Sequence, residues 1–226
     1  EMIRKTFFSV SPDETRQALN GLLLEVEGDN ASLVGTDGHR LAMISRPVKS
    51  NAEKGGVLSF LLPKKALSEL LKLMEDEDAT FGFSSQDNHL AFICSKQVIV
   101  SRKIDGKFPN YRQVIPSDNP LKAKADRSGL THALKRVALL ADEKSKMVRF
   151  EIQKGNLSLI SDNTDLGAAH EEMPIEYDGE EVSIGLNAKY VLDILNVIEG
   201  DSVTLNLKDQ NHSCLFTVGD DDQYKS

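Results

Sequence analysis

The chain has 226 residues, of which 40% are hydrophobic and 27% are charged, and its formal net charge is −8. This length fits one large domain or two domains of ordinary size, and the composition is that of a globular protein rather than a disordered one. The sequence contains no apolar run long enough for a membrane-spanning helix, and its first residues lack the pattern of a signal peptide. The negative charge argues against tight electrostatic wrapping of nucleic acid, but it leaves room for a basic face on an acidic body.

The cysteine pattern limits which metal sites and disulfides the protein can contain. The two cysteines, Cys94 and Cys214, each lie in an apolar, strand-like run, and neither belongs to a Cys-x-x-Cys pair. This pattern argues against a zinc site and against a disulfide framework. We therefore expect no cofactor or metal, and a reducing, cytoplasmic location.

The first half of the chain shows the patterns of two helices and several strands. The segment from Met2 to Val10 is expected to be the end of a helix. Pro63 is acceptable at a first helical position and is expected to open a second helix. The apolar stripe of that helix is expected to contain Ala66, Leu67, Leu70, Leu71 and Met74. Further on, Leu90, Phe92 and Cys94 alternate with the two-residue period of a strand.

The second half shows the same kinds of element. A helix is expected from near Ser128, and its buried face is expected to hold Ala133, Leu134, Val137 and Ala138. Alternating apolar residues predict two strands, one through Val148, Phe150 and Ile152 and one through Val203, Leu205 and Leu207. Asn187 is a good N-cap for the last helix. That helix is expected to bury Val191, Ile194, Leu195 and Ile198.

The two halves also repeat one another. Ten apolar positions of the first half recur as apolar positions, five of them 126 positions later and five of them 124 positions later. The first group is Leu22, Leu24, Val26, Leu33 and Val34, and the second group is Leu67, Leu70, Leu71, Phe81 and Phe83. We therefore predict two homologous domains, residues 1–120 and 121–226. The order helix, strands, helix, strands in each predicts an α+β fold with helices on antiparallel sheets.

Basic residues gather on two predicted helices, whereas acidic residues gather in connections. The basic residues are Lys64, Lys65 and Lys72 on the helix after Pro63, and His132, Lys135 and Arg136 on the helix near Ser128. The acidic runs lie in 75–78, 178–181 and 220–222. Such charges usually form a solvated surface, and a basic helical face that meets phosphate is the alternative. The last helix, where Asp193 and Glu199 outweigh Lys189, does not favour that alternative.

The most distinctive short stretch is Thr36-Asp37-Gly38-His39-Arg40-Leu41. It is typical of a strand end, an Asp-Gly turn and the next strand, because Gly38 can take a positive φ. A catalytic interpretation would use Asp37 and His39 as an acid–base pair or as metal ligands. No nucleophile or second histidine supports this at a suitable spacing, and the second half has Ser161-Asp162-Asn163-Thr164 instead. The sequence therefore favours binding over catalysis.

Three stretches resemble signatures of the bacterial β sliding clamps, the ring-shaped subunits of replicative DNA polymerases. They are Thr36–Ala42, Phe108–Pro116 and Asn187–Asp193, in the order found in that family. The resemblance covers essentially the whole chain and implies the clamp's middle domain, residues 1–120, and its C-terminal domain, residues 121–226. It also implies a first helix truncated at its N-terminus, and a short apolar strand and tail after Ser226 in the parent protein.

The resemblance implies a DNA-clamp fold, in which inner helices line a hole and outer antiparallel sheets form the wall. In this family two three-domain subunits close head to tail into a homodimeric ring around duplex DNA, so this chain alone is not expected to close a ring. The implied function is that of a non-catalytic processivity factor, which holds DNA polymerase, clamp loader and repair proteins through short linear motifs. The residues expected to face DNA are Lys5, Lys64, Lys65 and Arg136.

The pocket that captures those motifs in the family corresponds to two groups of residues here. One group is Thr36, Gly38, His39, Arg40, Leu41, Pro109 and Val114, and the adjoining group is Arg16, Leu19, Asn187, Tyr190 and Ser213. The resemblance implies an apolar floor, with His39 and Arg40 at a polar rim. From the residues alone, burial in an ordinary core is the simpler interpretation of the apolar members.

Two other functions stay open at the level of the sequence. One is an enzyme that uses Asp37 and His39, whose activity would be lost in His39→Ala. The other is a duplicated protein-interaction module that does not encircle DNA. Retention of the full-length protein on circular DNA, with loss from linear DNA, distinguishes a clamp from such a module.

Overall fold

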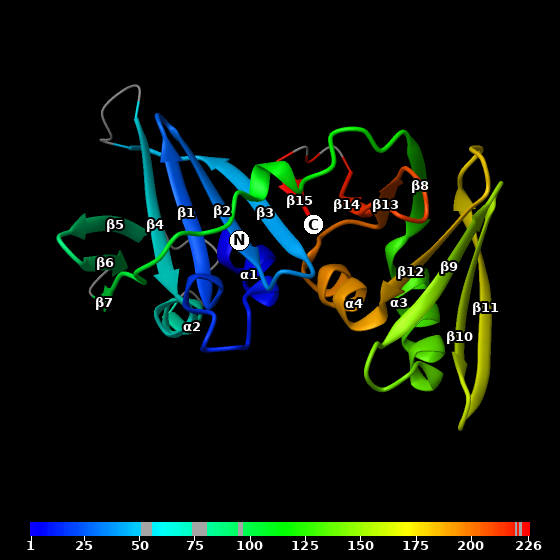
Figure 1. Ribbon diagram of the computed structural model, residues 1–226. Helices are drawn as coiled ribbons and strands as arrows, with labels where there is room; N and C mark the ends of the chain where they lie inside the picture. Colours follow the sequence, from blue (N-terminus) through cyan, green and yellow to red (C-terminus); the bar gives the residue numbers. More distant parts are fainter. Residues whose placement is uncertain (51–55, 74–80, 95–96, 220, 222) are drawn as a thin grey trace. The chain divides into compact units, whose positions relative to one another are not determined.

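The computed structural model (Figure 1) describes residues 1–50, 56–73, 81–94, 97–219, 221 and 223–226. Met74, the acidic run 75–78, Asp220 and Asp222 lie outside the described residues. The chain divides into two compact units, Glu1–Tyr111 and Arg112–Ser226, so residues 112–120 cluster with the second unit. None of the described helices is both long enough and apolar enough to cross a membrane.

The first unit combines short helical elements with two antiparallel sheets. Its helical elements are α1 (Met2–Thr6), the 3-10 helices η1 (Phe7–Ser9) and η2 (Gln17–Leu19), and α2 (Lys64–Leu73). Its strands are β1 (Gly21–Glu27), β2 (Asn30–Thr36), β3 (Leu41–Pro47), β4 (Val57–Pro63), β5 (Phe81–Gln86), β6 (His89–Cys94) and β7 (Gln97–Arg102). One sheet has the order β3-β2-β1-β4 and the other the order β5-β6-β7. A further 3-10 helix, η3 (Tyr111–Gln113), spans the boundary between the units.

The second unit has one continuous sheet in the order β12-β9-β10-β11-β8-β13-β14. Its strands are β8 (Leu121–Asp126), β9 (Met147–Gln153), β10 (Asn156–Asn163), β11 (Gly167–Glu176), β12 (Val182–Asn187), β13 (Ser202–Leu207), β14 (Leu215–Thr217) and the short β15 (Tyr224–Lys225). Its helical elements are α3 (Arg127–Val137), η4 (Ala138–Leu140) and α4 (Ala188–Val197). The last residue, Ser226, exchanges both backbone hydrogen bonds with Phe216 (2.6 and 3.2 Å) and thereby ties the chain end to β14.

The repeat predicted from apolar positions is also a repeat of strand register. Leu24 pairs with Leu33 in the first unit, and their counterparts Phe150 and Leu159 pair in the second. The ends of β1 and β4 pair in the same way as the ends of β9 and β12. Because register decides which side chains face the core, the shared apolar pattern and the shared pairing have one physical cause.

Each unit places two neighbouring helices on its sheets (Figure 1). In the first unit α1 packs against β2 and β3, α2 packs against β1, β4 and β7, and the two helices contact each other. In the second unit α3 packs against β8, β10 and β11, α4 packs against β12, and these helices also contact each other. The predicted α+β architecture of tandem repeated domains is therefore confirmed.

The helix ends follow the local rules of capping. The Asn187 side chain accepts a hydrogen bond from the Tyr190 amide (3.2 Å), which confirms the predicted N-cap of α4. At the other end of α4, Arg127 donates to the carbonyls of Leu195 (3.2 Å) and Gly200 (2.7 Å), where a helix leaves acceptors without partners. The predicted start of α2 was wrong by one residue: Pro63 ends β4, and the helix begins at Lys64.

The predicted apolar stripes are largely buried. Val191, Ile194, Leu195 and Ile198 lie in the core, as do Val148, Phe150 and Ile152. On α3 the buried residues are Leu130, Ala133, Leu134 and Val137. Ala138 is only half-buried, because the α-helix tightens there into the 3-10 turn η4.

Strand β2 and the N-terminal helical segment meet without an intervening side chain at Gly35. A Cβ at this position would lie 2.4 Å from the Ser9 Oγ and 2.9 Å from the Thr6 carbonyl oxygen. The Ser9 hydroxyl donates to that same carbonyl (2.6 Å), and the Thr6 hydroxyl donates to the Met2 carbonyl (2.9 Å). Thr6 and Ser9 are fully buried, so their hydroxyls depend on these local acceptors. Glycine at position 35 therefore lets η1 lie directly on the sheet.

The variant Gly35→Ala is expected to lower the free energy of unfolding by about 1–3 kcal/mol, the usual cost of forcing volume into a close-packed contact. The matched control is Gly82→Ala in β5, where the nearest atom to an added Cβ lies 3.8 Å away. Urea denaturation followed by circular dichroism measures both variants. Equal effects of the two substitutions would contradict the close packing of η1 on β2.

Candidate functional site

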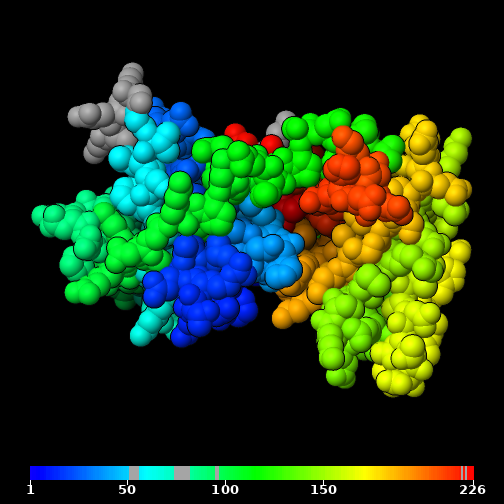
Figure 2. All heavy atoms as spheres, in the orientation of Figure 1, coloured from blue at the N-terminus to red at the C-terminus, as the bar shows by residue number. Residues whose placement is uncertain are grey.

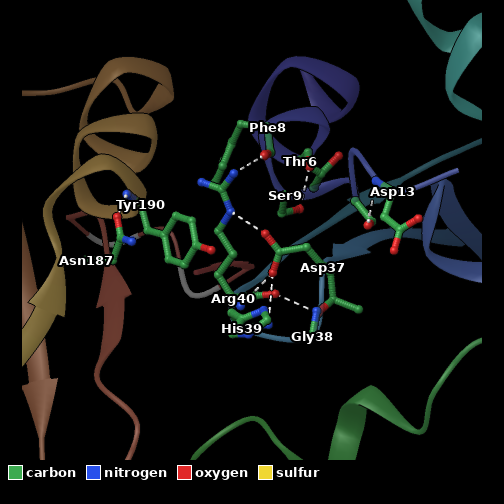
Figure 3. Close-up of polar contacts among 12 residues, drawn as sticks. Thr6, Phe8, Ser9, Asp13, Asp37, Gly38, His39, Arg40, Asn187 and Tyr190 are labelled. Carbon is green, nitrogen blue, oxygen red and sulfur yellow. Dashed lines mark hydrogen bonds and ion pairs between the residues drawn. The ribbon is translucent and has the colours of Figure 1, made fainter. Parts of the chain in front are cut away.

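The hairpin turn between β2 and β3 holds most of the predicted site residues of the first unit (Figure 3). Thr36 and Leu41 form the last strand pair before the turn. The Thr36 hydroxyl accepts from the Gly38 amide (3.1 Å) and donates to the Arg40 carbonyl (2.6 Å). Gly38 has a φ of 92°, a conformation that favours glycine, so the turn predicted from the sequence is confirmed.

Asp37 holds the backbone of this turn and the Arg40 side chain at the same time (Figure 3). Its Oδ1 accepts from the amides of His39 (2.9 Å) and Arg40 (3.1 Å), and its Oδ2 accepts from the Arg40 Nε (3.1 Å). Asp37 is only 7% exposed, so these donors take the place of water around the carboxylate. This arrangement uses Asp37 as a structural acceptor and does not favour an acid–base role for it.

The Arg40 guanidinium is directed at η1 and not at solvent. Its Nη2 donates to the Phe8 carbonyl (2.6 Å), and its Cζ lies 5.3 Å from the centroid of the Phe8 ring, within cation–π range. The side chain is only 13% exposed. The resemblance implies a polar rim for Arg40, whereas in the structure its charged group contacts Asp37 and Phe8.

Arg16 reaches the same turn from a separate segment of the chain. Its Nη1 donates to the Asp37 carbonyl (2.9 Å), and a Cβ at Gly38 would lie 3.1 Å from its Nη2. The glycine therefore leaves space for the guanidinium. Leu19, at the end of η2, is 6% exposed and belongs to the core. The structure thus brings Arg16 and the turn from Thr36 to Leu41 into one network.

Pro109 lies exposed between two buried aromatic residues of the segment that follows β7. Phe108 and Tyr111 are both buried, and the Tyr111 hydroxyl donates to the Glu25 Oε2 (2.7 Å) on β1. In Figure 2 this segment, drawn in green, lies on the surface of the first unit. The two buried aromatic side chains therefore keep Pro109 at the surface.

In the second unit, two predicted site residues lie at the start of α4. Besides capping the helix, the Asn187 side chain donates to the Ser145 carbonyl (2.9 Å). Tyr190 lies half-buried in the first turn of the helix (Figure 3). This hydrogen bond therefore attaches the first turn of α4, which contains Tyr190, to the loop before β9.

The other two predicted site residues of the second unit, Val114 and Ser213, are exposed. The Ser213 carbonyl accepts from the Asn119 side-chain amide (2.9 Å), which also donates to the Asn206 carbonyl (2.9 Å). Asn119 therefore links two parts of the second unit, namely the segment before β8 and the loop that contains Ser213. The sequence analysis assigned no role to Asn119.

The apolar members of the predicted site differ in burial. Leu19 is buried and Leu41 is half-buried, whereas Pro109 is exposed and Val114 is 62% exposed. An ordinary core position therefore accounts for Leu19, but not for Pro109 or Val114. Exposed apolar side chains of this kind are available to a ligand.

The residues expected to face DNA are not equally available in the structure. Lys5 is 8% exposed, and its Nζ lies 2.9 Å from the Glu1 carboxylate. The hydrogen bond from Arg46 is the main cause that lowers the pKa of that carboxylate to about 2. Lys64 is half-buried, whereas Lys65 is exposed on α2. Of these lysines, Lys65 is the most accessible.

Arg136 is exposed on α3 but is paired with an acidic residue of β11. Its Nε and Nη2 donate to the two oxygens of Glu171 (2.6 and 2.9 Å). These hydrogen bonds lower the pKa of Glu171 and raise the pKa of Arg136. This pairing could not be predicted from the sequence, because the two residues lie far apart in the chain and meet only through the packing of α3 on β11.

Metal and thiol chemistry find little support in the part of the chain that the structure describes. There, no group of three or more His, Cys, Asp or Glu side chains is arranged to hold a metal ion. Cys94 and Cys214 are free thiols, and Cys94 is buried. Burial raises the pKa of the Cys214 thiol, which disfavours the reactive thiolate.

The sequence of the chain matches two family models in tandem. Residues 1–110 match the DNA polymerase III beta subunit, central domain, and residues 112–226 match its C-terminal domain. A beta sliding clamp of Pseudomonas aeruginosa is 34% identical over 98% of this chain and 60% of its own length. The beta sliding clamp of Escherichia coli is 32% identical over 92% of this chain and 56% of its own length. The chain thus spans about three-fifths of the length of these relatives.

The structure matches solved sliding clamps over nearly its whole length. A Pseudomonas aeruginosa DNA polymerase sliding clamp with ligand has a TM-score of 0.94 and 33% identity, over 99% of this chain and 61% of that one. A sliding clamp from the same organism bound to griselimycin also has a TM-score of 0.94 and 33% identity, over 99% of this chain and 60% of that one. The fold is therefore that of the sliding clamps. The chain belongs to the DNA polymerase III beta subunit family, as its resemblance in sequence had indicated.

Proposed function

We propose that this chain supplies the central and C-terminal domains of a processivity factor, a ring that keeps a bacterial replicative DNA polymerase on duplex DNA in the cytoplasm. The observation that carries the proposal is the match of both family domains, in order, over residues 1–110 and 112–226. The use of Asp37 to hold a turn supports a non-catalytic role. The clamp raises the effective concentration of polymerase at its template and needs no chemistry of its own.

The proposed contact with DNA is weak and topological. A closed ring does not need tight binding, because the duplex cannot leave until an interface opens. The exposure of Lys65, the neutralisation of Arg136 by Glu171 and the net charge of −8 all support weak contacts that leave the ring mobile. Lys64 would add to this basic surface, and Lys5, paired with Glu1, is expected to contribute least.

The proposed partners are DNA polymerase, clamp loader and repair proteins, each held through a short linear motif. In the first unit the residues proposed to form the site are Arg16, Leu19, Thr36, Gly38, His39, Arg40, Leu41 and Pro109, and in the second they are Val114, Asn187, Tyr190 and Ser213. The exposure of Pro109, Val114 and His39 supports a role in contact with a ligand. A related clamp has been solved with griselimycin, which gives a chemical probe for this site.

The proposed homodimer ring needs an edge at which subunits can join, and β11 offers one. From Gly167 to Pro174 this strand pairs with β10 on one side, whereas β8 joins its other side only at Ile175 and Glu176 in the described chain. Leu166 precedes β11, and Leu139 lies in η4, which packs against β10 and β11; both leucines are exposed. Unpaired backbone beside exposed leucines favours association with a second chain.

The variant Pro109→Asp is expected to weaken griselimycin binding at least about tenfold, because it places a charge on an exposed apolar contact that would have to lose its water. Isothermal titration calorimetry of the 226-residue chain measures the affinity. Val98→Asp on β7 is the matched control, since it also replaces an exposed apolar residue of the first unit. Wild-type affinity in Pro109→Asp would remove Pro109 from the site.

Encirclement is tested with the full-length protein, loaded by its clamp loader onto a nicked circular DNA. We expect the protein to stay with the circle through gel filtration at high salt and to be lost when one cut linearises the DNA, because a topological link does not depend on charge. A control sample without clamp loader measures binding that does not require loading. Equal loss from circular and linear DNA would contradict the ring and would favour an interaction module without encirclement.

A further inference from the structure

The two oxygens of the Asp37 carboxylate serve different partners. Oδ1 accepts from the backbone amides of His39 and Arg40, and thus shapes the turn. Oδ2 accepts from the Arg40 Nε, and thus orients the arginine side chain. The position of Arg40 and the backbone shape of its own turn are therefore fixed by one buried group.

The same arginine connects the turn to the N-terminal helical segment. Its Nη2 donates to the Phe8 carbonyl in η1, and its guanidinium lies against the Phe8 ring. One residue before Thr36, the close contact of Gly35 with Thr6 and Ser9 joins β2 to this segment as well. The turn is thus attached to the α1–η1 segment at two places, once through the strand and once through Arg40.

We propose that Arg40 is a positioning residue, which presents the turn to the ligand and does not bind the ligand through its own charge. In this view exposed His39 and half-buried Leu41 make the contact, and the Asp37–Arg40 pair holds them in a ready conformation. A turn that is ordered before binding loses less conformational freedom when the ligand arrives. The inference rests on the proposed function, since it concerns how the proposed ligand site is held.

Two conservative substitutions interrupt the pair in different ways. Asp37→Asn keeps one oxygen for the backbone amides but places an NH2 group opposite the Arg40 Nε, so two donors face each other. Arg40→Lys keeps the positive charge, but a single ammonium lacks the planar fork that reaches Asp37 and the Phe8 carbonyl together. If Arg40 acted on the ligand through charge alone, Arg40→Lys would be nearly neutral.

The first measurement uses the 226-residue chain without ligand and follows backbone amide exchange by hydrogen–deuterium mass spectrometry. We expect residues 38–41 to exchange about tenfold faster in Arg40→Lys than in the wild type, since the bonds that order the turn are weakened. Arg102→Lys, at an exposed arginine of the same unit, is expected to leave exchange unchanged. Exchange in β1 and β4 reports whether the first unit of each variant is folded. Unchanged exchange in Arg40→Lys would overturn the positioning role.

The second measurement is calorimetric titration of griselimycin into Asp37→Asn, Arg40→Lys and the double variant. Each single substitution is expected to weaken binding about tenfold, and the double variant is expected to be no weaker than the worse single one, because both act through one pair. Additive losses, or wild-type affinity in Arg40→Lys, would overturn the proposal. A loss of affinity with unchanged exchange would also overturn it and assign Arg40 to direct ligand contact.

The two levels of failure are distinguishable. If the wild-type chain does not bind griselimycin, the proposed ligand site is wrong and the ligand-presenting role falls with it. Exchange in the ligand-free variants then still decides whether the Asp37–Arg40 pair orders the turn. If the wild-type chain binds but Arg40→Lys is normal in both measurements, the site stands and only the positioning role is refuted.

Discussion

The buried Asp37 carboxylate is the constraint on which the candidate site of the first unit depends. An ionised group with so little access to water must find donors within the protein, and it finds them in the backbone of its own turn and in Arg40. Arg40 in turn needs an acceptor for the rest of its guanidinium and takes the Phe8 carbonyl. These requirements fix the turn, expose His39 and connect the hairpin to η1. The proposed binding surface would therefore have most of its shape before any ligand arrives.

The distribution of charge is consistent with the proposed weak contact with DNA. On α3, Arg136 is held by Glu171, and on α2 Lys65 is exposed. Within an acidic chain, a few such residues would give weak attraction to phosphate, while the acidic balance would discourage indiscriminate binding to nucleic acid. Tight attraction would hinder sliding, so ion pairs that moderate the basic helices are consistent with a clamp.

The sequence predicts the fold more fully than the site, for a physical reason. Alternating apolar residues such as Phe150 and Ile152 decide strand register locally, and Asn187 caps α4 through an amide only three residues further on. Both features can therefore be recognised in the sequence. The Arg40 guanidinium points inward because it binds the Phe8 carbonyl, and the charge of Arg136 is neutralised by Glu171. In both cases the partner is distant in the sequence and is brought near only by packing. The resemblance to sliding clamps names the residues proposed for the site, but it does not say which of them point at a ligand.

We propose that the turn from Thr36 to Leu41 is a binding surface that internal hydrogen bonds order before a ligand arrives. A crystal structure of the chain with griselimycin would show both where the ligand binds and whether Arg40 moves. We expect the Arg40 guanidinium to keep its contacts with Asp37 and the Phe8 carbonyl, and the ligand to touch Leu41 and Pro109. A guanidinium that leaves Asp37 to contact the ligand, or a ligand bound away from this turn, would contradict a binding surface that is ordered in advance.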